Sequence, residues 1–149
     1  MENNKGALSE ELISDIEYLL REMSLLIKRK GREILNHFPI TPPQFTALLW
    51  LNEEGDMTIG ELSQKMYLAC STMTDLIDRM EKNGVVVRVR DERDRRVVRV
   101  RMLERGKAII EDVMKARREY LADILSTFSP EDVESIRKRL SMLYERMKE

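Results

Sequence analysis

The chain has 149 residues, of which 42% are hydrophobic, 36% charged and 5% aromatic, and its single cysteine excludes an internal disulfide framework. This length and composition predict one helix-rich domain with its own apolar core rather than a disordered or disulfide-built protein. The net charge is −1, but residues 79–107 carry 11 Lys/Arg against 5 Asp/Glu, while the remainder carries 15 against 22. Such a basic segment in an acidic chain is typical of phosphate binding, although a solvated charged hairpin has the same composition.

We expect no secretory leader and no membrane partner. The first nine residues lack an apolar core, and no later run reaches the roughly 18 apolar residues that a membrane span needs. One cysteine beside ten methionines fits a reducing compartment. The expected location is therefore the cytoplasm.

A long amphipathic helix is expected over residues 10–38, with Ser9 as its cap. Apolar residues recur along it at three- and four-residue steps, among them Leu12, Ile16 and Leu19. A small domain cannot bury so long an apolar stripe alone. We therefore expect these three residues to contribute to a homodimer interface.

Three shorter helices are expected over residues 42–54, 59–67 and 70–82. Capping-box patterns mark the first two starts, and Asn83-Gly84 supplies the left-handed stop of the third. The tight link between the last two helices indicates a helix-turn-helix whose second helix enters the major groove. Its outer face carries the candidate DNA-binding residues Ser71, Thr72, Thr74, Asp75 and Arg79. The hydroxyls of Ser71 and Thr72 could instead satisfy backbone groups in the first helical turn.

Alternating valines and arginines then predict two strands, one over residues 85–90 and one over residues 97–102. The residues between them, 91–96, are all charged and lack glycine, so we expect a long, mobile hairpin loop, or wing. Arg95 at its tip is expected to enter the minor groove of DNA. Four further arginines are expected to support phosphate contact or the hairpin itself: Arg88, Arg93, Arg96 and Arg99. Asp94 is expected to hold either Arg79 or Arg96.

Two more helices are expected, over residues 104–127 and from Pro130 to the C-terminus. The last one has apolar residues at a spacing of three and four that suits a partner helix better than a globular core. These expected dimerisation residues are Val133, Ile136, Leu140, Leu143 and Met147.

The chain has few residues of the types that catalysis and metal binding require. It has one histidine, His37, one cysteine, Cys70, and no glycine-rich phosphate loop. We therefore expect no enzymatic activity, no metal and no cofactor.

Several motifs, in order along the chain, resemble those of the MarR family of transcriptional regulators. They are Ile40–Phe45, Ile59–Ser63, Ser71–Thr74, Asp78–Gly84, the wing residues Asp91, Asp94, Arg95 and Arg96, and Glu104–Gly106. The similarity covers residues 40–110, and the wing motif is its most specific part. Ala69 and Leu103 stand where the family commonly has a capping serine and a capping threonine, and Asp75 where a small or basic residue is frequent.

The resemblance implies a mainly α (α+β) winged helix-turn-helix with long N- and C-terminal dimerisation helices. Residues 1–38 and 104–149 would form the dimerisation region and residues 39–103 the DNA-binding module. The implied function is a homodimeric repressor of transcription that a small ligand releases from a palindromic operator in double-stranded DNA. Residues that could line a ligand pocket, or could equally be plain core, are Tyr18, Met23, Phe45, Trp50 and Met114.

Two alternatives to a ligand-released repressor stay open. One is a winged-helix module whose charged wing binds an acidic protein partner. The other is a redox-sensing regulator that uses Cys70, which lies near the start of the expected groove-binding helix. Small thiols are more often buried and inert, so we expect Cys70 to pack against the helix-turn-helix.

Overall fold

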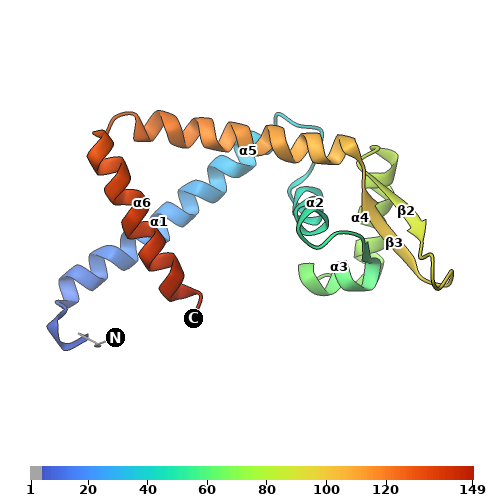
Figure 1. Cartoon of the computed structure of the whole chain (residues 1–149), viewed down its shortest axis with the longest axis horizontal. Coiled ribbons are helices and arrows are strands. Elements are labelled where there is room, and N and C mark those ends of the chain that lie inside the picture. The colour runs from blue at the N-terminus through green and yellow to red at the C-terminus, as the bar shows by residue number, and fades with distance from the viewer. Residues whose placement is uncertain (1–4) are drawn as a thin grey trace. The chain divides into compact units, whose positions relative to one another are not determined.

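A computed structural model describes residues 5–149, which divide into two compact units between Ile110 and Glu111. The two units are described separately. The first contains α1–α4, a small sheet and the start of α5, and the second contains the rest of α5 and α6 (Figure 1). Six α-helices and one three-stranded sheet confirm the predicted fold class, a mainly helical winged helix-turn-helix.

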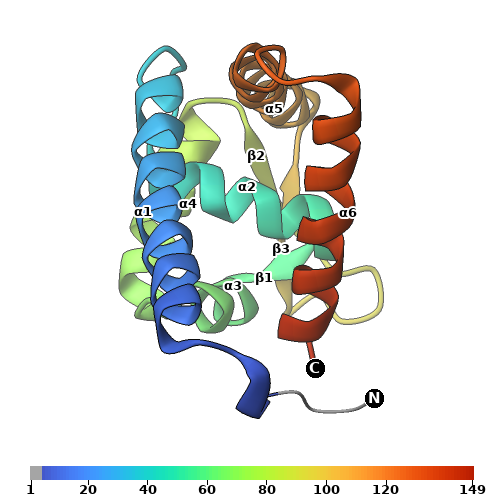
Figure 2. The same ribbon diagram turned by 90° about the vertical axis from the view of Figure 1, so that its left-hand side faces the viewer.

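The long first helix, α1, covers Glu10–Leu35 and runs without a break (Figure 2). Ser9 caps it as predicted, because its Oγ accepts a hydrogen bond of 3.1 Å from the amide of Leu12. The helix ends three residues earlier than expected. Pro39 disfavours the helical conformation at Phe38, and the amides of His37 and Phe38 bond instead to carbonyls three residues back.

The three helices of the central module have the predicted starts. They are α2 (Pro42–Glu54), α3 (Ile59–Met66) and α4 (Cys70–Lys82). Thr41 and Gln44 form a complete capping box at α2, with bonds of 3.4 and 3.2 Å. At α4 the N-cap is Ala69, which offers no side-chain bond, so the departure noted in the sequence leaves this helix uncapped.

The sheet contains the two predicted strands, β2 (Val86–Arg90) and β3 (Val98–Met102), and a short strand that the sequence did not predict, β1 (Met57–Thr58). The order is β1-β3-β2 and all pairing is antiparallel. Val86 pairs with Met102 and Arg88 with Val100, so Arg88 shares the inner face with two buried valines, Val86 and Val100.

The core of the first unit lies where α2, α3 and α4 pack on the sheet. Its fully buried side chains include Leu48, Leu62, Met73, Ile77, Met80, Val85, Val86 and Val100. The start of α5 (Glu104–Leu125) approaches this core closely at Gly106, where an added Cβ would lie 2.7 Å from the carbonyl oxygen of Val85. Glycine is therefore required there, and its position fixes how α5 leaves the sheet.

The second unit contains residues 111–125 of α5, a short turn and α6 (Pro130–Met147). Ser129 caps α6 by accepting a 3.1 Å bond from the amide of Asp132, and Pro130 occupies the first helical position, as predicted. No side chain of α6 is buried.

Both α1 and α6 leave apolar side chains exposed among the described residues. On α1, Leu12, Ile16 and Leu19 are each about half exposed. On α6, Leu140 and Met147 are exposed by 50% and 71%, while Val133 and Ile136 are partly covered. Among residues 5–149, no helix combines the length and the apolar character needed to cross a membrane.

Candidate nucleic-acid interface

The outer face of α4 is polar and largely unpaired. Ser71, Thr72, Asp75 and Arg79 are exposed, while Met73, Ile77 and Met80 on the opposite side are buried. Thr74 differs from the others because it is half-buried and its hydroxyl donates a 2.9 Å bond to the carbonyl of Cys70. Within the described residues, the hydroxyls of Ser71 and Thr72 have no partner and are available to bases or phosphates.

A shallow hollow of about 290 Å³ lies between this face and the start of α2. Its lining combines three polar residues, Thr72, Asp75 and Arg79, with three apolar ones, Pro43, Leu68 and Leu76. A methyl group beside hydrogen-bonding groups is what a thymine presents in the major groove. The hollow therefore gives α4 apolar as well as polar means of contacting a base edge.

The wing loop is organised by one carboxylate, Asp91. Its Oδ2 accepts bonds from the amides of Arg93 and Asp94, at 3.1 and 3.0 Å, and its Oδ1 accepts one from Arg99 Nε at 3.1 Å. The amide of Asp94 and the guanidinium of Arg99 hold the pKa of Asp91 below its usual value. The expected length of the loop is confirmed, but the sequence did not show that its backbone is tied together in this way.

The arginines of the wing differ in whether their side chains form ion pairs. Arg96 pairs with Asp94 at 3.1 Å, which confirms one of the two partners expected for this aspartate. The contact with Arg96 lowers the pKa of Asp94. The side chains of Arg93 and Arg95 are exposed, and within residues 5–149 these two residues form hydrogen bonds only through their backbones: the Arg93 amide donates to Asp91, and the Arg95 carbonyl accepts from Arg90 at 2.8 Å. Among the described residues Arg95 therefore has a free guanidinium at the tip of the hairpin.

Arg88 and Arg99 are held inside the module. Arg88 contacts Asp78 at 2.7 Å and Glu81 at 2.9 Å, so it ties β2 to α4. Arg99 contacts Asp91 at 3.1 Å and Glu61 at 3.4 Å, and thereby joins the wing to α3. Of the two roles expected for these arginines, the geometry favours support of the hairpin.

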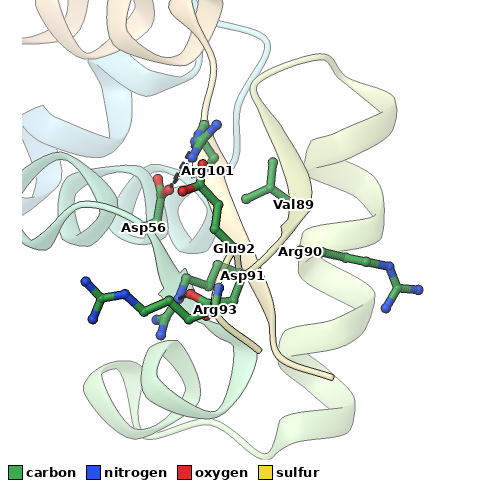
Figure 3. Close-up of a pocket in the computed structure, with 8 residues that line it drawn as sticks. Asp56, Val89, Arg90, Asp91, Glu92, Arg93 and Arg101 are labelled. Carbon is green, nitrogen blue, oxygen red and sulfur yellow. Dashed lines mark hydrogen bonds and ion pairs between the residues drawn. The ribbon is translucent and has the colours of Figure 1, made fainter. Parts of the chain in front are cut away.

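A second hollow, of about 500 Å³, was not anticipated from the sequence (Figure 3). It is lined by Asp56, Val89, Arg90, Asp91, Glu92, Arg93, Arg99 and Arg101. Arg101 pairs with Asp56 at 2.8 Å, whereas Arg90 and Arg93 extend to opposite sides of the hairpin. The alternation of arginine with valine along the strands was the signal that could have indicated it.

The residues considered for a ligand pocket have different surroundings. Phe45 is buried in the core of the first unit, and the ring of Trp50 lies 5.1 Å from the ammonium of Lys65. Tyr18 and Met23 are exposed on α1, and Met114 is half-buried in the second unit. A role of these residues in binding a ligand stays a prediction.

Cys70 is exposed, so the expectation of a buried thiol is wrong. It is the first residue of α4, and its Sγ lies 3.4 Å from the hydroxyl of Ser63, a buried residue of α3. His37 is also exposed. Across residues 5–149 no group of three or more His, Cys, Asp and Glu side chains could hold a metal ion.

Comparison with known proteins gives consistent matches over most of the chain. The MarR family model matches residues 40–98. An uncharacterised HTH-type transcriptional regulator of Bacillus subtilis strain 168, YsmB, is 56% identical over 93% of this chain and 94% of its own length. The transcriptional repressor MdtR of the same organism is 26% identical over 84% of this chain and 81% of its own length. The structure of a MarR family protein from Bacillus stearothermophilus is 53% identical, with a TM-score of 0.82 over 95% of this chain and 99% of that one.

Proposed function

Because the chain belongs to the MarR family of winged helix-turn-helix transcriptional regulators, we propose that it is a homodimeric repressor that binds a palindromic operator. In this proposal α4 of each copy enters the major groove and Arg95 enters the adjacent minor groove. Such a regulator acts on the chromosome, which places it in the cytoplasm of a bacterial cell.

One observation carries the proposal for the DNA interface. The unpaired hydroxyls and guanidinium of α4, at Ser71, Thr72 and Arg79, belong to the same compact unit as the free guanidinium of Arg95. Three carboxylates of this unit, on Glu81, Asp94 and Asp91, are instead engaged with Arg88, Arg96 and Arg99. Within the described chain Asp75 on α4 is left free, and its carboxylate can accept a hydrogen bond from a base amino group. The groups left free are therefore those that suit phosphates and base edges.

The exposed apolar surfaces support a homodimer. The stripe on α1 and the seam on α6 leave large side chains in water, which a soluble chain avoids by pairing them with a second copy. We assign residues 1–38 and 104–149 to this dimerisation region and residues 39–103 to the DNA-binding module. A two-fold dimer presents two recognition helices, and this symmetry requires a palindromic site.

The proposed repressor is released from its operator by a small ligand. The name of the relative MdtR, a transcriptional repressor, supports the direction of control. A ligand that binds more tightly to a dimer conformation in which the spacing of the two α4 helices does not fit the operator would lower the affinity for DNA. The residues considered for this pocket are Tyr18, Met23, Phe45, Trp50 and Met114.

The direct test is selection of bound fragments from random duplex DNA with the purified protein. Recovery of a palindromic sequence supports the proposal. Recovery of no preferred sequence at any salt concentration contradicts it and favours a wing that binds an acidic protein. Effector release is then tested on the selected duplex, since a ligand that lowers affinity must itself bind the free protein more tightly.

The exposure of Cys70 favours a second candidate for the trigger, oxidation of its thiol. An added oxygen or disulfide partner at the first residue of α4 would lie beside Ser71 and Thr72. Peroxide treatment of the wild-type protein and of Cys70→Ser, followed by titration with the operator, tests this candidate. Loss of affinity in the wild type alone supports it, and equal affinity in both removes it.

A further inference from the structure

Tyr67 is the C-cap of α3, in the turn that leads to α4. Its backbone has φ 55° and ψ 41°, which makes it the one residue other than glycine with a positive φ in the described chain. Its side chain is 95% exposed. A bulky residue in the left-handed region is unusual, and it ordinarily needs a compensating contact.

The local backbone imposes this conformation whatever side chain is present. The amide of Leu68 donates a 2.9 Å bond to the carbonyl of Ser63, and the amide of Tyr67 donates a 3.4 Å bond to that of Gln64. These two bonds form the Schellman motif that ends α3, in which glycine or asparagine is the preferred residue at this position. Tyrosine therefore destabilises the turn, and its exposed ring gains no packing in return.

The position of the turn indicates where the compensating contact lies. Tyr67 precedes the first residue of α4, Cys70, by three residues, and Ser71 and Thr72 follow at once. In a helix-turn-helix on DNA, the N-terminal residues of the second helix face base edges while the first helix crosses the backbone. The connecting turn consequently meets the sugar-phosphate chain at the edge of the major groove.

We propose that the hydroxyl of Tyr67 donates a hydrogen bond to a backbone phosphate at this edge and so positions α4 in the groove. The inference rests on the proposed binding of α4 to DNA and adds a positioning residue to it. A tyrosine hydroxyl is a usual donor to phosphate oxygens, and such contacts fix the register of a protein on the duplex without reading sequence. The phenol is uncharged and releases no counterion, which distinguishes it from Arg95.

Two variants separate the hydroxyl from the backbone strain. Tyr67→Phe removes only the hydroxyl, whereas Tyr67→Asn removes the ring and places a residue that tolerates the left-handed conformation. Each is compared with the wild type for melting temperature, for operator affinity at several salt concentrations, and for phosphates whose ethylation blocks binding.

We expect both variants to lose affinity by roughly tenfold per half-site, the scale of one hydrogen bond to a charged group, with an unchanged salt slope. In both variants, ethylation of one phosphate per half-site that blocks binding of the wild type should no longer affect binding. Tyr67→Phe should melt like the wild type, and Tyr67→Asn at the same temperature or a few degrees higher.

Three results would overturn the inference. Wild-type affinity of Tyr67→Phe would show that the hydroxyl makes no contact. Wild-type affinity of Tyr67→Asn would assign the exposed ring to another partner, such as a protein. If the wild-type chain itself selected no duplex, the proposed function would fail as well, so the two failures are distinguishable.

Discussion

Both carboxylate oxygens of Glu81 hold Arg88. Oε2 accepts a 2.9 Å bond from the Arg88 amide, and Oε1 accepts one of the same length from its guanidinium. The same guanidinium also reaches Asp78. The helix α4 and the first strand of the wing are thus joined at one residue, which couples the orientation of α4 to that of the hairpin.

Arg88→Met should lower the free energy of unfolding by about 1 to 2 kcal/mol, because it leaves two acidic groups of α4 without their cation. Urea denaturation of the purified variant measures this loss. The matched control is Arg101→Met, which removes the more exposed ion pair with Asp56 and should lower the free energy of unfolding by much less than Arg88→Met. Equal losses in the two variants would contradict the assigned role of Arg88.

Arg95→Ala should leave stability unchanged and weaken operator binding by about 1 to 3 kcal/mol per half-site, since its guanidinium has no partner in the described chain. The effect should be largest at operators with A·T-rich flanks, where the minor groove is narrow. Titration at several salt concentrations checks this, and the salt dependence should become shallower. Wild-type affinity with an unchanged salt slope would make the wing a purely structural element.

The wing should lose its order in acid as Asp91 becomes protonated. The amide of Asp94, together with Arg99, lowers the pKa of Asp91 in the folded chain below the usual 3.8. A carboxyl with a lowered pKa contributes stability that is present above its unfolded pKa and disappears as the pH falls through the folded value. Carboxyl NMR titration should therefore place the midpoint of Asp91 below 3.8.

The same aspartate offers a control at neutral pH. Asp91→Asn removes the charge, so the amides of Arg93 and Asp94 should exchange their hydrogens faster than in the wild type. A midpoint for Asp91 at or above its usual value, or unchanged exchange in Asp91→Asn, would show that this carboxylate does not organise the loop.

Leu140→Asp should convert the dimer into the 17.6 kDa monomer, because a charge in the middle of the α6 seam would be buried without a partner. Sedimentation equilibrium at micromolar concentration measures the mass. Ser141→Asp places the same charge on the next residue, outside the seam, and should remain dimeric. A wild-type chain that sediments as the monomer would refute the proposed dimer.

Much of the fold follows from local sequence signals. The capping residues Thr41 and Thr58 predicted the starts of α2 and α3, and Asn83-Gly84 predicted the end of α4. The short strand β1 gave no such signal. Its two residues, Met57 and Thr58, are a strand only because they pair with Val100 and Arg99, about 40 residues further along the chain.

The sequence predicted which residue types form the candidate interface, but not which of their side chains pair with one another. Alternation placed Arg88 in a strand, but whether it faces DNA or Glu81 depends on how β2 packs on α4. The exposure of Cys70 and the left-handed backbone of Tyr67 likewise result from the geometry of the turn. Composition and spacing do not encode such tertiary relations.

The spacing of half-sites tests the central claim most directly. Two α4 helices related by a two-fold axis require half-site centres about one helical turn apart, roughly 34 Å. Inserting five base pairs between the half-sites of the selected operator turns one of them to the opposite side of the duplex. Measured by fluorescence anisotropy, the affinity should fall to that of a duplex with one half-site. Undiminished affinity for the lengthened operator would contradict a dimer that reads both half-sites at once.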